Sequence, residues 1–127
     1  MIPKNIPALT EVELKIMTSL WKIAEGPVQE VMKVMARKPP LAYTSVSTML
    51  RILEKKKFVT ARKEGKAHIY IPLISKKDYE NFGVQNLIEK VFEGNPLGLL
   101  RNLVHQKGLS EKERETLRHL FAPGEKP

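Results

Sequence analysis

The stretch Tyr43–Leu73 reads YTSVSTMLRILEKKKFVTARKEGKAHIYIPL, and it decides the fold. Its first half has the apolar spacing i, i+3, i+4, i+7, which predicts a helix from about Tyr43 to the lysine run at residues 55–57. The opposite face repeats short polar side chains and one cation at the same spacing. The apolar face consists of Val46, Met49, Leu50 and Leu53, and the polar face of Thr44, Ser47, Thr48 and Arg51.

The second half of this stretch is predicted to be a β-hairpin. Two short strands, at about Phe58–Lys63 and Ala67–Pro72, flank the tight turn Glu64-Gly65-Lys66. Small hydrogen-bonding side chains beside an arginine suit the major groove of DNA, where base edges offer donors and acceptors. A helix of this kind followed by a basic hairpin is typical of a winged helix-turn-helix. The sequence therefore predicts a mainly α fold with a small β-hairpin wing that binds duplex DNA.

The segment before this stretch is predicted to contain two helices. Thr10 as N-cap with Glu13 three residues later forms a capping box, which starts the first helix, and Glu25-Gly26-Pro27 ends it. The second helix is expected over about Val28–Arg37, because the two prolines that follow Lys38 cannot continue it.

Three further helices are predicted after residue 74. The first begins at the capping pair Ser75 and Asp78 and runs to about Phe92, the second covers roughly Leu97–Gln106, and the third runs from Ser110 to about Phe121. The expected organisation is a winged-helix DNA-binding domain at residues 1–74, a helical dimerisation region at 75–122, and a disordered tail at 123–127.

The C-terminal helices are too few and short to support an independent hydrophobic core. They carry many apolar side chains, and pairing with the same segment of a second chain would bury them. We therefore expect a homodimer, since two-fold dimers are the commonest oligomers; folding back onto the winged helix of the same chain is the alternative. The expected interface consists of Leu87, Val91, Phe92, Leu99, Leu100, Leu103, Leu117 and Leu120.

The positive charge of the chain is concentrated in its first half. Of the formal charge of +8, residues 1–74 hold 13 Lys and Arg against 6 Asp and Glu, and residues 37–66 hold 9 against 2. A cluster of cations of this kind favours binding to a polyanion, with nucleic acid as the first candidate and an anionic membrane as the second. A basic surface that only keeps the protein in solution is the alternative.

Composition and motifs exclude several classes of function. The absence of cysteine excludes disulfides and thiolate metal sites. The three histidines lack the short spacing of a zinc motif, so neither a metal nor a cofactor is expected. Gly-rich phosphate loops and nucleophile elbows are also missing, which argues against an enzyme. With no signal peptide and no apolar run long enough to cross a bilayer, the expected location is the cytoplasm without membrane insertion.

The candidate DNA contacts lie on the helix and the hairpin. Arg51 could bind a guanine or a phosphate, and the hydroxyl groups and free amides at Tyr43 and Thr44 suit a phosphate. The cations of the hairpin also suit phosphates, although a charged tip in water is the alternative, and Lys55 is explained almost as well by the helix dipole. The full set is Tyr43, Thr44, Ser45, Ser47, Thr48, Arg51, Lys55, Arg62, Lys63 and Lys66.

The order of the predicted elements and several short sequence motifs resemble those of the penicillinase repressor family of bacterial transcriptional regulators, the BlaI/MecI/CopY group. The similarity covers almost the whole chain, and the helix and hairpin motifs together are its specific part. The matching segments are LTEVELKIM at residues 9–17, Trp21, TSVSTMLRILEKK at residues 44–56 and RKEGKAHIY at residues 62–70.

This resemblance implies a dimeric repressor of pseudo-palindromic operators, often built on TACA/TGTA half-sites. In the β-lactam-responsive members, a membrane sensor leads to a proteolytic cut in the dimerisation arm. The position that looks like this cut is Asn102-Leu103, where the family pattern has Asn followed by Phe. Copper-responsive members carry paired Cys-x-Cys motifs, which this chain lacks.

Two other functions remain open from the sequence. A winged helix can serve as a protein-interaction module that does not read DNA, and a basic one can bind any duplex without an operator. The 9 cations against 2 anions in residues 37–66 suit DNA better than a protein partner.

Overall fold

The structure is a computed structural model, and it describes residues 8–106 and 108–120. The chain divides into two compact units, Met1–Phe82 and Gly83–Pro127, here called the N-terminal unit and the C-terminal unit. Among the described residues, none of the helices combines the length and hydrophobicity that crossing a bilayer requires.

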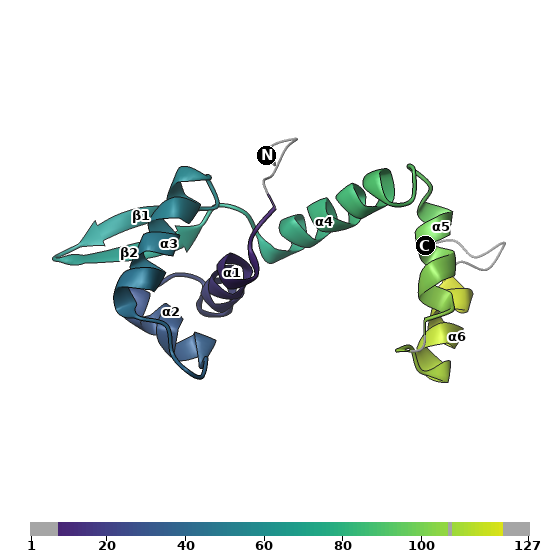
Figure 1. Cartoon of the computed structure of the whole chain (residues 1–127), viewed down its shortest axis with the longest axis horizontal. Helices are drawn as coiled ribbons and strands as arrows, with labels where there is room; N and C mark the ends of the chain where they lie inside the picture. Colours follow the sequence, from purple (N-terminus) through teal and green to yellow (C-terminus); the bar gives the residue numbers. More distant parts are fainter. Residues whose placement is uncertain (1–7, 107, 121–127) are drawn as a thin grey trace. The chain divides into compact units, whose positions relative to one another are not determined.

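Three complete helices, a hairpin and the first turns of a fourth helix make up the N-terminal unit (Figure 1). The helices are α1 (Glu11–Ile23), α2 (Val28–Met35) and α3 (Tyr43–Lys55), and the strands are β1 (Val59–Glu64) and β2 (Ala67–Pro72). This arrangement confirms the predicted winged helix-turn-helix. The predicted capping box at Thr10 is also present, with the Glu13 amide donating to the Thr10 hydroxyl at 3.1 Å and the Thr10 amide donating to the Glu13 carboxylate at 2.9 Å.

Several element boundaries differ from the predictions by one or two residues, and for two of them the backbone gives the reason. Helix α2 ends at Met35 and not at Arg37, because Ala36 takes a left-handed conformation (φ 46°) that stops the helix. Strand β1 begins at Val59 and not at Phe58, because the Phe58 amide donates to the Leu53 carbonyl at 2.9 Å and so belongs to the exit of α3.

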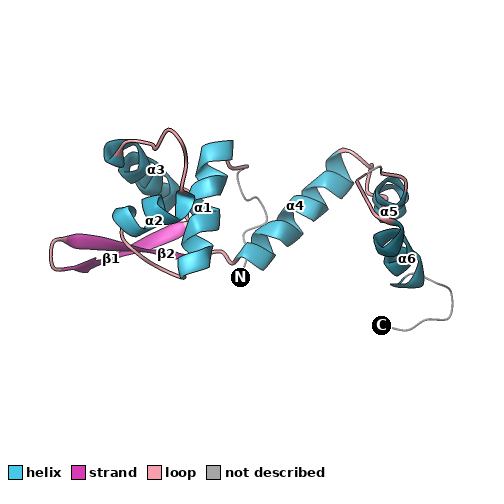
Figure 2. Cartoon of the chain, turned by 90° about the horizontal axis from the view of Figure 1, so that it is seen from below, coloured by secondary structure: helices cyan, strands magenta, loops and turns pink. Residues whose placement is uncertain are grey.

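The hairpin is attached to the loop between α1 and α2. The amide of Gly26 donates to the carbonyl of Tyr70 at 3.1 Å, and the amide of Tyr70 donates to the carbonyl of Gly26 at 2.9 Å. Since the N–H and C=O of a strand residue point to the same side, Gly26 lies on the edge of β2 that faces away from β1. At its other end the hairpin projects beyond the helices in both views (Figures 1 and 2).

The core of the N-terminal unit lies between the three helices and the base of the hairpin. Every element contributes to it: Ile16, Met17, Leu20, Val28, Val31, Val46, Leu50, Leu53, Phe58, Val59, Tyr70 and Ile74. At about 1.5–3 kcal/mol for each large buried side chain, this cluster is the main stabilising feature of the unit.

A largely buried ion pair joins α1 to the end of α3. Lys56 Nζ lies 3.0 Å from Glu13 Oε2, and the two side chains are 31% and 7% exposed. Burial alone would raise the pKa of Glu13. The hydrogen bonds from Thr10 and the hydrogen bond and charge of Lys56 outweigh burial and lower this pKa below its ordinary value.

Helix α4 (Lys76–Lys90) starts within the N-terminal unit and continues into the C-terminal one. Its first turns are anchored by aromatic contacts, since the ring of Tyr79 lies 6.0 Å from those of Trp21 and Phe58. Trp21 also donates its indole N–H to the Ile74 carbonyl at 2.9 Å, which fixes the chain just before α4.

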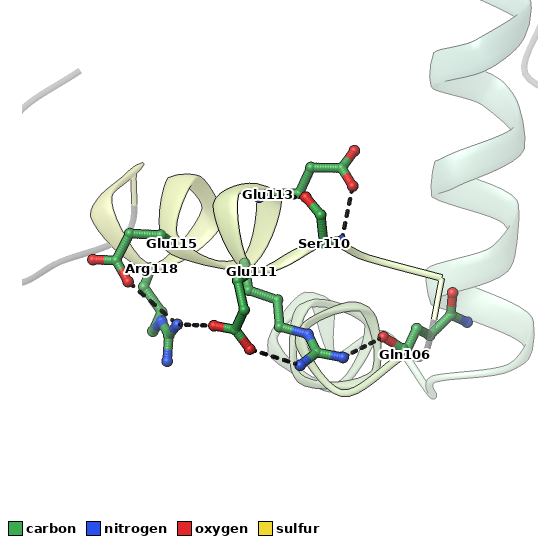
Figure 3. Close-up of polar contacts among 7 residues, drawn as sticks. Gln106, Ser110, Glu111, Glu113, Glu115 and Arg118 are labelled. Atoms are coloured by element: carbon green, nitrogen blue, oxygen red, sulfur yellow. Dashed lines mark hydrogen bonds and ion pairs between the residues drawn. The ribbon is translucent and has the colours of Figure 1, made fainter.

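The C-terminal unit continues with α5 (Pro96–Val104) and α6 (Glu111–Leu120). Asn95 caps α5, and Ser110 with Glu113 forms the predicted capping box of α6. Arg114 ties the helices together, because its Nη2 donates to the Gln106 carbonyl at 2.9 Å and its Nη1 lies 3.3 Å from Glu111 (Figure 3). Among the described residues from 83 onward, no side chain is buried.

The ion pair between Glu13 and Lys56 should stabilise the protein in a pH-dependent way. We expect Glu13→Gln to lower the free energy of unfolding by about 1–2 kcal/mol at pH 7, because Lys56 then lacks its charged partner. Since the folded pKa of Glu13 is lowered from 4.5, this stabilisation is present above that pH and is lost as the pH falls through the lowered value.

Urea unfolding at pH 7 and pH 3 measures this effect. The difference between wild type and Glu13→Gln should be smaller at pH 3. Glu11→Gln is the matched control, because Glu11 is 85% exposed and lies 3.7 Å from Lys15, and we expect it to change stability by less than about 0.5 kcal/mol. Equal losses in the two variants would contradict this interpretation.

Candidate nucleic-acid interface

Helix α3 turns its predicted polar face away from the core. Val46, Leu50 and Leu53 are fully buried on one side. The predicted contacts Tyr43, Thr44, Thr48, Arg51 and Lys55 are exposed, and Ser45 and Ser47 are half-buried. Burial of the apolar stripe therefore leaves a row of hydroxyl groups and cations along the accessible side of the helix.

The two faces of the hairpin carry different chemistry. The register pairs Ala61 with Tyr70 and Lys63 with His68. Because side chains alternate along a strand, Lys63 and His68 lie on the same face as buried Tyr70, which is the face toward the core and α3. Arg62 and Glu64 lie on the opposite face.

A shallow depression of about 440 Å³ connects α3 with the first of these faces. It is lined by Arg51, Glu54, Ala61, Lys63, His68 and Tyr70. Two predicted contacts from different elements, Arg51 and Lys63, thus border one surface. This arrangement can hold an anion that contacts the helix and the hairpin together.

A second depression, of about 280 Å³, lies at the N-termini of α2 and α3. Its lining includes Val28 and Gln29 from α2, Tyr43 from α3, and Lys66 and His68 from the hairpin. Neither helix has a side-chain hydrogen bond at its N-cap, which is Pro27 for α2 and Ala42 for α3. The Glu30 amide donates to the Pro27 carbonyl at 3.1 Å, and the first amides of both helices are available to an anion, which the helix dipoles favour there.

The hairpin cations, which were predicted together, separate in the structure. Lys63 and Lys66 border the two depressions. The guanidinium of Arg62 is paired on the other face, where its Nη2 lies 2.6 Å from both Glu25 Oε2 and Glu64 Oε2. These hydrogen bonds and charges raise the pKa of Arg62 above its ordinary value.

Among the residues that border these depressions and that the sequence did not predict, His68 and Gln29 have side chains that can donate hydrogen bonds to DNA. His68 lines both of them, and Gln29 lines the one at the helix N-termini. The alternation of β2 could have found His68, because it stands two positions before the core residue Tyr70. Gln29 carries no comparable signal, since its position follows from how α2 packs against the rest of the unit.

The predicted dimer residues lie on accessible surfaces of the C-terminal unit. Leu87 and Val91 are 39% and 63% exposed. Phe92, Leu99, Leu100, Leu103 and Leu117 are half-buried, and the Leu120 side chain lies outside the described part of the structure, as do the residues of the predicted tail. Asn102 and Leu103, the predicted cleavage position, lie within α5, with Asn102 exposed.

The described residues provide no metal site. Within residues 8–106 and 108–120, no group of three His, Cys, Asp or Glu side chains is placed to hold a metal ion. The two depressions are lined by cations, by the His68 imidazole and by one carboxylate, that of Glu54.

Comparison with known proteins connects this arrangement to one family. The sequence model of the penicillinase repressor family matches residues 9–122. The chain is 27% identical to the penicillinase repressor of Bacillus licheniformis, over 87% of this chain and 86% of the relative. It is 24% identical to the methicillin resistance regulatory protein MecI of Staphylococcus aureus, over 89% of this chain and 92% of the relative.

A solved structure supports the same relationship. The solution structure of the DNA-binding domain of the repressor BlaI superposes with a TM-score of 0.51 at 32% sequence identity, and the match covers 61% of this chain and 94% of that domain. The sequence model spans every element from α1 to α6, so the chain belongs to the penicillinase repressor family, whose members are transcriptional repressors and not enzymes.

Proposed function

We propose that this protein is a dimeric, sequence-specific DNA-binding repressor that acts on pseudo-palindromic operators. The observation that carries the proposal is the convergence of Arg51 from α3 with Lys63 and His68 from the hairpin on one depression. Beside it lie the uncapped N-termini of α2 and α3. The first group suits base edges and phosphates, and the second suits phosphates alone.

The proposed division of labour places DNA binding in residues 1–74 and dimerisation in residues 75–122. DNA binding is supported by the similarity to the DNA-binding domain of BlaI. Dimerisation is supported by the C-terminal unit, where no described side chain is buried while Val91 and Leu97 are each 63% exposed. A second copy of the unit would cover this apolar surface and provide the core that one copy lacks.

In the proposed complex, the two copies of α3 enter successive major grooves, 34–36 Å apart or a multiple of that distance. The names of the relatives, a penicillinase repressor and a methicillin resistance regulator, favour a role in the response to antibiotics. Control by a membrane sensor and a cut at Asn102-Leu103 stay predictions.

Selection of bound duplexes from a random DNA library, at near-physiological salt, tests this proposal. Enrichment of an inverted repeat, with half-sites about one helical turn apart, is the expected result. Binding without enrichment would contradict sequence specificity and indicate a general DNA binder. No binding to any duplex would overturn the proposal in favour of a protein-interaction module.

Arg51→Ala should weaken binding to the selected duplex more than binding to a scrambled one. A good contact to a base edge discriminates by about 1–3 kcal/mol, which corresponds to roughly 5- to 150-fold in affinity. Fluorescence anisotropy with both duplexes measures the ratio. Lys63→Ala is the control, because a phosphate contact strengthens binding to both duplexes alike. A loss of equal size on both duplexes for Arg51→Ala would mean that Arg51 contacts only phosphate.

Leu100→Asp and Leu103→Asp should each weaken dimerisation at least about tenfold, because an unpaired carboxylate in an apolar interface costs several kcal/mol. Sedimentation equilibrium measures the dissociation constant of the dimer. Leu73→Asp is the matched control, since Leu73 is 55% exposed at the end of the hairpin and lies outside the proposed interface. Dimerisation that is unchanged in both α5 variants would place the interface elsewhere.

A further inference from the structure

Arg62 joins two carboxylates that come from different parts of the N-terminal unit. Its Nε and Nη2 donate to Glu64 Oε2 at 2.8 and 2.6 Å, and Nη2 also donates to Glu25 Oε2 at 2.6 Å. Glu64 is the last residue of β1, and Glu25 lies in the loop between α1 and α2. The side chains of all three residues are about half exposed, at 47%, 42% and 57% for Arg62, Glu25 and Glu64.

These contacts cross the sheet. Gly26, next to Glu25, pairs with Tyr70 on the edge of β2 that faces away from β1, whereas Arg62 belongs to β1. The Arg62 side chain therefore reaches over β2 to the loop. A single exposed ion pair contributes little, but a guanidinium that donates three hydrogen bonds to two carboxylates constrains the geometry of the segments that carry them.

The hairpin face that carries Lys63, His68 and Tyr70 points toward the core and is here called the inner face, and the opposite face, which carries Arg62 and Glu64, is the outer face. The two faces differ in charge. Glu25 and Glu64 outnumber Arg62, so this cluster carries a formal charge of −1. The inner face presents Lys63 beside Arg51 and His68. A phosphate that approached the outer face would meet two carboxylates whose nearest cation is already paired.

We propose that Arg62 is a positioning residue, which straps the hairpin to the loop between α1 and α2 and makes no contact with DNA. The hairpin then contacts the duplex through the face that carries Lys63. The contacts of Arg62 with Glu25 and Glu64 help to fix the angle between the hairpin and α3. This inference rests on the proposed DNA-binding function. It departs from the prediction that Arg62, Lys63 and Lys66 act alike on phosphates.

Amide hydrogen exchange of the free protein tests the strap without any DNA. The probes are the amides of Gly26 and Tyr70, whose mutual hydrogen bonds fasten the hairpin to the loop. Arg62→Gln should make both amides exchange at least about threefold faster, relative to the amide of core residue Leu50 as an internal reference. Lys63→Ala is the matched control and should leave both unchanged. Equal exchange in Arg62→Gln and wild type would overturn the strap.

The salt dependence of binding to a 30-base-pair duplex that carries the selected inverted repeat tests the absence of a phosphate contact. The variant with Glu25→Gln, Arg62→Gln and Glu64→Gln has no charge in the cluster, and it should keep the wild-type slope of log affinity against log salt. Lys63→Ala should reduce the magnitude of this slope by about 0.9 for each half-site that it contacts.

A reduction of the slope in the triple variant as large as that in Lys63→Ala would show that Arg62 neutralises a phosphate, and would overturn the inference. If the wild-type protein bound no duplex at all, the proposed function would fail, and the exchange measurement would still decide whether Arg62 acts as a strap.

Discussion

Burial of one stripe of α3 is the constraint on which the rest of the interface depends. Val46, Leu50 and Leu53 are fully buried. With 3.6 residues per turn, this fixes the rotation of the helix about its axis and leaves Thr44, Thr48 and Arg51 accessible. A turned α3 would expose three large apolar side chains, at a cost of about 1.5–3 kcal/mol each. The polar row is thus held in place by the side chains opposite to it.

Burial also decides which side chains of the hairpin lie on each face, because successive side chains of a strand alternate between two faces. Tyr70 is buried, and its backbone is held by Gly26, so His68 and its partner Lys63 must lie on the inner face. A slip of one residue in the register would turn Lys63 to the opposite face and replace it with Arg62 or Glu64, depending on the direction of the slip. Two short periodicities, each anchored in the core, bring Arg51 and Lys63 to one depression although 12 residues separate them in the sequence.

Local signals explain why much of this fold could be predicted from the sequence. The capping box at Thr10, the apolar spacing of α3 and the glycine of the hairpin turn each involve residues within a few positions of one another. The boundary at Met35 could not be predicted, because it depends on the left-handed backbone of Ala36. The pairs Glu13–Lys56 and Arg62–Glu25 join residues 43 and 37 positions apart, and local pattern carries no information about such contacts. For the same reason the hairpin cations were predicted as one group.

The two units would contribute to the proposed repression in different ways. In the proposed dimer, the N-terminal units contact the DNA, and the C-terminal units hold the two N-terminal units close to each other. Once one half-site is bound, the second N-terminal unit is held at a high local concentration near the other half-site, and the joint affinity exceeds that of either unit by orders of magnitude. Separation of the C-terminal units removes this gain while every DNA contact stays intact. In the proposed dimer, a unit without a buried side chain among its described residues would depend on its partner for stability, and the dimer contact, not the winged helix, would be the sensitive point for control.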